Sequence, residues 1–320
     1  MKTRSAVRMA SSGIFICLML ICLAHLVFRG SGWAGFLSFV ALPAIPGLLA
    51  IAALLFLLKQ RLAGLASLGA AILLAVPPLG VLNGQSTSAD QVPDVTILWL
   101  NARHSHVALD NIFDLDSNLQ ADIIAIAETP VNWRKRYSEE LAKFDCIEWR
   151  HARGAPRLLV LSRMPCELAS SSGDLSEYTP HRYVDLADGL RVVALHAPRP
   201  FDFSYISKTG RPWDSTRLQT RNDAIGEAAM RARQRVDAVL IGDFNAVSWS
   251  PPLTELHTIG LQTVRCGPIW HSTWVDKHSG LGVPIDHVFV SASLKAICSV
   301  APGVGSDHRP LVVRLYRADK

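Results

Sequence analysis

The sequence predicts an α/β domain that follows an apolar, helical N-terminal region. Short runs rich in Val, Ile and Leu alternate with amphipathic segments after residue 94, as expected for strands interleaved with helices around one core. No Asp or Glu occurs among residues 1–82, and long apolar stretches fill that region. Acids, amides and histidines lie at the ends of the predicted strands, where open α/β sheets build their functional sites.

The N-terminal region is predicted to cross a membrane three times. Its apolar stretches cover residues 13–28, 33–58 and 62–82, and about 20 apolar residues span a bilayer as a helix. Pro43 and Pro46 are expected to kink the second helix. The alternatives are a cleaved signal peptide at the first stretch and buried helices of a soluble protein. The lack of a small-residue cleavage site and of acidic residues favours membrane helices.

Basic residues predict the orientation of these helices. Within residues 1–82, Lys and Arg precede the first stretch or separate the second from the third, and only Arg29 lies between the first and second. This pattern places the N-terminus in the cytoplasm. The prediction is a multi-pass protein of the inner (plasma) membrane, held in the lipid bilayer by residues 1–82. A linker at residues 83–93 would lead to a folded domain at residues 94–320 on the periplasmic or extracellular side.

Charge and cysteine content describe this folded domain further. All 27 acidic residues lie after Leu82, so the domain is close to neutral although the whole chain carries a net charge of +5. The basic character of the whole chain is therefore no argument for nucleic-acid binding. An oxidising compartment would permit disulfides, but the spacing does not reveal the pairing of Cys146, Cys166, Cys266 and Cys298.

The order of the predicted elements defines one α/β domain with a buried core. Apolar, β-branched runs predict strands at residues 95–100, 123–127, 158–161, 191–196, 238–241, 285–290 and 311–315. Apolar positions at helical spacing predict helices at residues 107–119, 132–143 and 215–236.

Polar side chains lie at the ends of six of these strands. They are Asn101, Glu128, His196, Asp243, Asn245, Asp286, His287, Asp307 and His308. Groups from separate strand ends can converge on one pocket. Their carboxylate and amide oxygens suit Mg²⁺, Mn²⁺ or Ca²⁺, and a metal beside histidines suits the hydrolysis of a phosphate ester. The structural alternative for each residue is a turn, a helix or strand cap, or a buried histidine.

Seven short motifs resemble those of the endonuclease/exonuclease/phosphatase superfamily, which includes deoxyribonuclease-I-like nucleases, abasic-site endonucleases, neutral sphingomyelinases and inositol-polyphosphate 5-phosphatases. They are Trp99-Leu-Asn101, Ala127-Glu128-Thr, Leu195-His196, Gly242-Asp-Phe-Asn-Ala246, Ser272-Thr-Trp274, Ile285-Asp-His-Val-Phe289 and Gly305-Ser-Asp-His-Arg-Pro310. The resemblance covers nearly all of the folded domain, and the chain is similar to membrane-anchored bacterial members. It implies a four-layer α/β sandwich with two facing mixed sheets and a site at one edge.

The resemblance also implies roles for individual residues. The metal, Mg²⁺ or Mn²⁺, would be bound by Glu128, Asn101 and Asp307. Asp243 would position or deprotonate the attacking water, which Asn245 would orient. His308 would act as general base or phosphate ligand, held in its tautomer by Asp286, and His196 would stabilise the phosphoryl oxygens or assist the leaving group. Metal and histidines would offset the charge that builds on the phosphoryl oxygens.

The predicted function is the hydrolysis of a phosphodiester, with nucleic acid and phospholipid both open as substrates. The chain departs from the family pattern at residues 157–165, and the phosphate-gripping residues of some nucleases have only weak candidates, Tyr178, His181 and Arg182. The alternative is a non-catalytic binding or sensing module on the same fold, tethered to a membrane. The complete polar set at the strand ends favours the enzyme.

Overall fold

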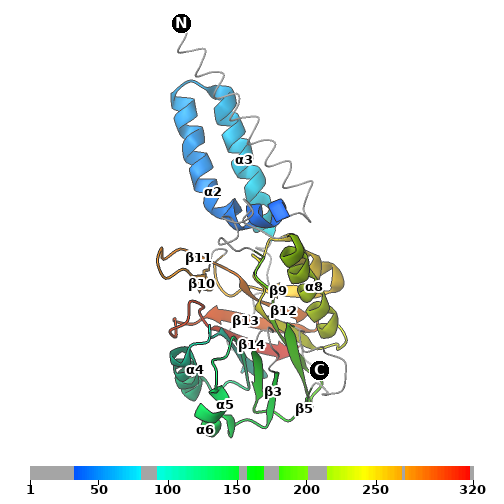
Figure 1. The fold of residues 1–320 in the computed structure, drawn as a ribbon. Coiled ribbons are helices and arrows are strands. Elements are labelled where there is room, and N and C mark those ends of the chain that lie inside the picture. Colours follow the sequence, from blue (N-terminus) through cyan, green and yellow to red (C-terminus); the bar gives the residue numbers. More distant parts are fainter. Residues whose placement is uncertain are drawn as a thin grey trace. The chain divides into compact units, whose positions relative to one another are not determined.

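A computed structural model describes residues 32–80, 92–150, 157–168, 180–200, 215–268 and 271–317. The chain divides into two compact units (Figure 1). One contains residues 1–83 together with 249–251, and the other contains the rest of the chain. The predicted domain boundaries, at residues 82 and 94, stay a prediction.

Among its described residues, the N-terminal unit contains the helices α2 (Gly32–Leu57) and α3 (Arg61–Gly80). They pack against each other through a small apolar cluster that includes Ala41, Leu48 and Ala70. These helices coincide with the second and third predicted membrane segments, while the first segment lies outside the described residues. Within the described part of the chain, no helix combines the length and apolar character needed to cross a bilayer. This finding does not support the prediction of three transmembrane helices. An apolar run predicts that a segment is buried, but it does not specify whether lipid or protein buries it.

The second unit contains two six-stranded mixed sheets. The first sheet has the order β13-β14-β1-β2-β4-β3, formed by Leu294–Val300, Leu311–Arg317, Val95–Asn101, Ile123–Ala127, Leu158–Ser162 and Cys146–Arg150. The second has the order β5-β6-β7-β8-β12-β9, formed by Cys166–Leu168, His181–Leu186, Arg191–His196, Ala238–Asp243, Asp286–Ser291 and Leu261–Val264. A short hairpin, β10 (Trp274–Val275) and β11 (Gly282–Val283), stands apart from both sheets.

Each sheet contains one parallel strand pair, joined by a helix. In the first sheet, α4 (His106–Leu119) connects β1 to β2, and in the second, α8 (Ser215–Ala232) connects β7 to β8. The other strand pairs are antiparallel. Because the strands of a parallel pair end at the same sheet edge, each sheet has one edge at which two strand ends lie together.

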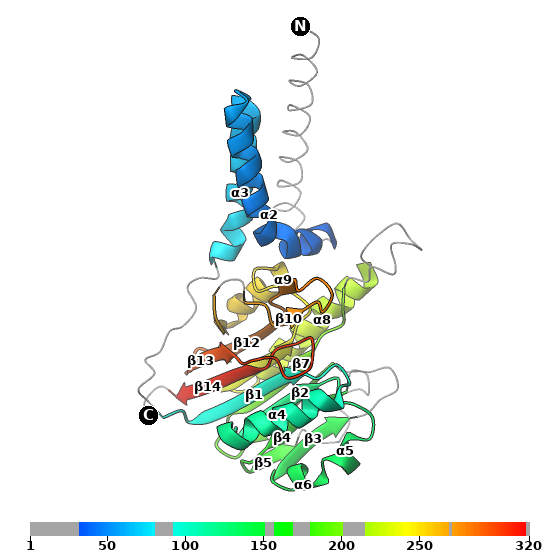
Figure 2. The same cartoon turned by 90° about the vertical axis from the view of Figure 1, so that its left-hand side faces the viewer.

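Apolar side chains hold four layers together. The two sheets face each other across a core that includes Ile97, Val160, Val192 and Val288. The outer face of the first sheet packs on α4, and that of the second packs on α8, as Figure 2 shows. Successive side chains of a strand point to opposite faces of the sheet. Each strand therefore places one set of side chains in the core between the sheets and the other set against a helix. The predicted four-layer sandwich with two facing mixed sheets is confirmed for this unit.

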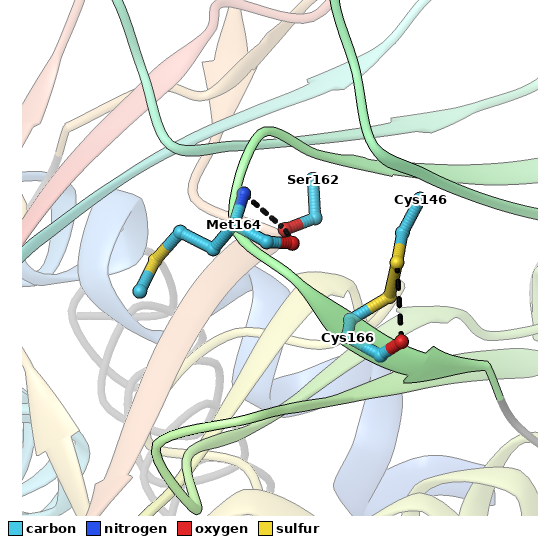
Figure 3. Close-up of a disulfide and its surroundings, with 4 residues drawn as sticks. All are labelled: Cys146, Ser162, Met164 and Cys166. Carbon is cyan, nitrogen blue, oxygen red and sulfur yellow. Dashed lines mark hydrogen bonds between the residues drawn. A yellow bond between two sulfur atoms is a disulfide. The ribbon is translucent and has the colours of Figure 1, made fainter.

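Two disulfides connect the sheets at opposite edges. Cys146 of edge strand β3 bonds Cys166 of edge strand β5, as Figure 3 shows. Cys266, just after edge strand β9, bonds Cys298 of edge strand β13. Each bond therefore joins one sheet to the other. The sequence left this pairing open because spacing along the chain carries no information about which edges face each other.

The remaining predicted elements agree with the structure except near residue 137. The predicted helix at residues 132–143 is two short helices, α5 (Trp133–Arg136) and α6 (Ser138–Leu141). Tyr137 breaks the helix, and its hydroxyl donates to Asp110 Oδ1 at 2.8 Å. A short helix, α9 (Pro251–Thr254), precedes a 3-10 turn, η3 (Glu255–Ile259). Strands β3, β5, β6, β9 and β13 were not predicted, because their sequences are short or mix polar and apolar residues.

Candidate active site

The two parallel strand pairs bring the predicted site residues to one end of the sandwich. In the first sheet, Asn101 at the end of β1 pairs in register with the residue before Glu128. In the second sheet, His196 at the end of β7 pairs with Asp243 at the end of β8. Asp286, at the start of antiparallel β12, lies opposite Asp243. Strand pairing brings residues together within each sheet, and the packing of the two sheets brings the two groups together.

Glu128 is surrounded by hydrogen-bond donors. Its Oε1 lies 3.3 Å from Asn101 Nδ2, 3.3 Å from His196 Nε2 and 3.5 Å from Arg199 Nη2. Its Oε2 lies 3.5 Å from His104 Nε2. Burial alone would raise the pKa of Glu128, but His196, Arg199 and Asn101 outweigh burial and lower this pKa to about 2. Glu128 is therefore a carboxylate at neutral pH.

Asp243 is a buried carboxylate between the two halves of the site. Its Oδ2 accepts a hydrogen bond from Asn101 Nδ2 at 3.1 Å, and its Oδ1 accepts one from the backbone N–H of Asn245 at 2.9 Å. Two imidazoles face the same Oδ2, with His196 Nε2 at 3.7 Å and His308 Nε2 at 3.8 Å. Burial and a neighbouring aspartate raise the pKa of Asp243 above its ordinary value. A raised pKa suits a carboxylate that accepts a proton.

The end of β8, which carries Asp243, is held on several sides. Gly242 lies so close to β7 that a Cβ would overlap the carbonyl oxygen of Leu195. Asn245 has a left-handed backbone, with φ of 46°, and its Nδ2 donates to the carbonyl oxygen of Ala197 at 2.8 Å. Arg221 of α8, only 1% exposed, donates from Nη1 to the carbonyl oxygen of Asn245 at 3.2 Å. These contacts fix the position of Asp243 before any substrate binds.

Asp286 orients His308. Its Oδ2 lies 2.8 Å from His308 Nδ1, and its Oδ1 accepts a hydrogen bond from Trp99 Nε1 at 2.8 Å. The backbone N–H of Asp286 donates to Thr273 Oγ1 at 2.9 Å. Burial opposes charge on both partners, but their mutual attraction dominates: the pKa of Asp286 is lowered and that of His308 is raised to about 9. His308 is therefore an imidazolium at neutral pH, with Nε2 facing Asp243.

Asp307 lies at the margin of this arrangement. Its Oδ2 accepts a hydrogen bond from Trp274 Nε1 at 3.1 Å and lies 3.1 Å from Arg103 Nη1. Across the residues that the structure describes, the carboxylate of Asp307 makes no hydrogen bond or ion pair with the side chains of Asn101 or Glu128. Binding a metal together with those two residues would require Asp307 to exchange partners.

Two overlapping groups of side chains could hold a divalent cation. Asp243, Asp286 and His308 offer ligand atoms that all lie within 4.8 Å of one another. However, both oxygens of Asp286 and Nδ1 of His308 already take part in hydrogen bonds. Glu128, with the amide of Asn101 and the adjacent Asp243, offers hard oxygen donors of the kind that Mg²⁺ and Mn²⁺ prefer. Glu128 and Asn101 would also have to exchange their present contacts, so it is the chemistry of the donors that favours the Glu128 side.

The structure brings seven of the eight predicted site residues into one connected network. They are Asn101, Glu128, His196, Asp243, Asn245, Asp286 and His308. Their individual chemical roles stay predictions. Of the weaker candidates, Tyr178 lies outside the described residues. His181 is buried, and burial and Arg231 lower its pKa to about 4.

Several partners of the network were missed by sequence reasoning. Trp99 and Thr273 fall within quoted motifs but received no role, although they bond Asp286 directly. Arg199, which faces Glu128, carries no sequence signal because it lies on a connection beyond a strand end. His104 was expected to lie at the surface or next to the site residues, and its Nε2 faces Glu128. His287 is buried and donates to or accepts from no site side chain among the described residues; its Nε2 lies 2.7 Å from the carbonyl oxygen of Ala246.

Comparisons with solved structures agree with this fold. An AP endonuclease from Archaeoglobus fulgidus is 16% identical, with a TM-score of 0.53 over 68% of this chain and 98% of that one. A variant of the 3′ phosphatase NExo from Neisseria, bound to product DNA hairpin, is 18% identical, with a TM-score of 0.53 over 69% and 99%. A mannosyl-6-phosphatase from Bacteroides thetaiotaomicron is 16% identical, with a TM-score of 0.51 over 70% and 100%. At these identities the likeness concerns the fold.

Sequence comparisons give the family. A UPF0294 protein from Vibrio cholerae is 36% identical over 81 residues, which are 24% of this chain, so the match spans about a quarter (26%) of that relative's length. The profile of the Endonuclease/Exonuclease/phosphatase family matches residues 98–308, well over half of the chain and the whole of the network described above. This chain therefore belongs to the endonuclease/exonuclease/phosphatase family.

Proposed function

We propose that this protein hydrolyses phosphodiesters with the help of a divalent cation, Mg²⁺ or Mn²⁺. The observation that carries the proposal is the position of Asp243 between two pairs of site residues. It faces the Asn101–Glu128 pair on one side and the Asp286–His308 pair on the other. A carboxylate in that position lies between the proposed metal ligands and a cationic group suited to bind phosphoryl oxygens.

The charges of the site support a cation. The carboxylates of Glu128, Asp243 and Asp286 are buried close together, whereas His308 is the buried cation that faces Asp243. Glu128 and Asn101 would hold the metal, which when bound would neutralise the phosphoryl oxygens. The proposed metal role of Asp307 would require it to leave Arg103 and Trp274.

The remaining roles follow from hydrogen-bond geometry and charge. Asp243, with its raised pKa, would accept the proton of the attacking water, and Asn245 would fix the carboxylate through its backbone N–H. His308 already carries its proton at neutral pH, so it would donate from Nε2 to a phosphoryl oxygen rather than act as base. His196, beside Glu128 and Asp243, would stabilise the phosphoryl oxygens or assist the leaving group.

The test is turnover of bis-p-nitrophenyl phosphate by the full chain with Mg²⁺, with Mn²⁺ and with a chelator. We expect metal-dependent turnover, and a loss of about 100-fold or more in kcat for Asp243→Ala and for His308→Ala. Arg136→Ala is the matched control, because Arg136 pairs with Asp110 on α4, outside the network. If wild type, tested on diesters, monoesters, DNA and phospholipid, releases no product with either metal, the non-catalytic binding or sensing module becomes the better description.

A membrane-anchored location is part of the proposal. Its support is the asymmetric distribution of basic residues in the first 82 positions, together with the two disulfides, which persist in oxidising compartments outside the cytoplasm. The lipid bilayer would hold the N-terminal helices, and the catalytic domain would lie on the periplasmic or extracellular side. A C-terminal alkaline phosphatase fusion should be active, whereas fluorescence from a C-terminal green fluorescent protein fusion would contradict this location.

A further inference from the structure

A pocket of about 210 Å³ opens beside Glu128, and the proposed mechanism does not use it. It is lined by the segment that directly follows Glu128, by α5 and by strands β3 and β4. Thr129, which follows Glu128 in the sequence, belongs to the pocket wall. Its carbonyl oxygen lies 3.3 Å from Arg157 Nη1 and 3.2 Å from His104 Nδ1, and His104 in turn faces Glu128.

The pocket combines aromatic walls with a cationic rim. Trp133 and Trp149 meet edge to face, with ring centroids 5.7 Å apart. The guanidinium carbon of Arg134 lies 4.7 Å from the centroid of the Trp149 ring, so this flat cation already stacks on the indole. Arg157 supplies a second positive charge, and no acidic residue lines the pocket within the described part of the chain.

These features select among the substrates that the proposed function leaves open. Indole faces stack well on flat aromatic rings, and guanidinium groups bind phosphates and stack on bases. A choline or ethanolamine head group carries a positive charge that bare indole faces would attract. Here Arg134 covers the Trp149 ring, and Arg134 and Arg157 would repel such a group with no carboxylate in the described pocket lining to compensate. A nucleotide offers the matching chemistry, with a flat base next to negatively charged phosphate.

We propose that this pocket binds the nucleobase next to the scissile phosphate, so that the substrate is a nucleoside-containing phosphodiester. The inference rests on the proposed function, because the pocket adjoins the same site. The base would stack on the guanidinium of Arg134, which lies over the Trp149 ring, and Arg157 would bind the adjoining phosphate. Removal of one such stacking contact should weaken the binding affinity by roughly tenfold or more.

Three esters with the same leaving group test this proposal with the full chain. They are thymidine 5′-(p-nitrophenyl phosphate), methyl p-nitrophenyl phosphate and p-nitrophenyl phosphocholine. We expect wild-type kcat/KM to be at least about tenfold higher for the thymidine ester than for the other two. Arg134→Ala and Trp149→Ala should lower kcat/KM for the thymidine ester, mainly through KM, by more than for the methyl ester, and so abolish that preference. Trp149→Phe should restore part of it, and Arg136→Ala, on the same short helix, should have no effect.

The outcomes separate the two proposals. Three results would overturn the nucleobase pocket and leave the proposed phosphodiesterase activity standing. They are equal turnover of all three esters, an equal loss of kcat/KM on all three in the variants, and a preference for the phosphocholine ester. Absence of turnover for every ester would overturn the proposed function. In that case calorimetric titration with thymidine 5′-monophosphate decides on the pocket: binding weakened about tenfold by Arg134→Ala supports it, and no binding to wild type rejects it.

Discussion

The two disulfides give the most direct test of how the sandwich is held together. Each joins the two sheets, and they do so at opposite edges. They close loops with sequence separations of 20 and 32 residues. In the chain-entropy description, such loops correspond to about 3 kcal/mol and about 4 kcal/mol of stability at 25 °C. The two loops do not overlap in sequence, so the contributions should add to about 7 kcal/mol.

Paired alanine substitutions separate these contributions. One variant replaces Cys146 and Cys166, another replaces Cys266 and Cys298, and a third replaces all four. Urea unfolding of the full chain, followed by tryptophan fluorescence, measures the free energy of unfolding. Because typical domains are stable by about 5–15 kcal/mol, the variant that lacks both bonds should lose about half of its free energy of unfolding or all of it.

The control is a reducing agent, which should destabilise wild type and leave the fourfold variant unchanged. Free energies of unfolding within about 1 kcal/mol of wild type in both double variants would refute the reasoning, since the sheets would then be held by their apolar core alone. Strong non-additivity would show that the two edges do not act independently. Alkylation of all four thiols in protein purified without reductant would show that the bonds do not form.

Three further predictions concern single substitutions. Asp286→Asn should lower kcat by about 100-fold or more while the fold, measured by circular dichroism, is retained, because His308 loses the carboxylate that orients and charges it. Asp185→Asn should cost about 3–5 kcal/mol in urea unfolding, because it leaves the buried guanidinium of Arg191 without its paired carboxylate. Burial opposes charge on Asp185, but Arg191 and Arg235 lower its pKa below 3.8, so this stabilisation is present above that pH and is lost as pH falls through the lowered value. Gly242→Ala should destabilise the protein by about 2 kcal/mol or more, because its methyl group would overlap β7.

Each of these predictions has a contrary result. Unchanged kcat in Asp286→Asn would remove the Asp286–His308 pair from the mechanism. A parallel loss of stability with acid in wild type and in Asp185→Asn would show that the Asp185–Arg191 pair does not titrate as described. A wild-type unfolding midpoint for Gly242→Ala would mean that β7 and β8 adjust to the added methyl group.

Local sequence determined most of the secondary structure in the catalytic unit. The runs that became β1, β2, β7 and β8 are apolar and β-branched over five or six residues, and such runs favour buried strands. Polar residues directly after those runs also marked the site, because a strand end fixes where its last side chain emerges. Strands such as β6 and β13 were missed because β6 has buried polar residues on both faces and β13 has exposed polar residues on one.

Only the tertiary structure decided how these residues meet and which partners they use. Pairing of β1 with β2 and of β7 with β8 places Asn101, Glu128, His196 and Asp243 together, and sequence spacing does not encode that pairing. The Trp99–Asp286 hydrogen bond joins residues 187 positions apart, and both disulfides depend on which sheet edges face each other. Local propensity acts within a few residues along the chain, whereas a site and its covalent cross-links are formed between strands that come together only when the sandwich packs.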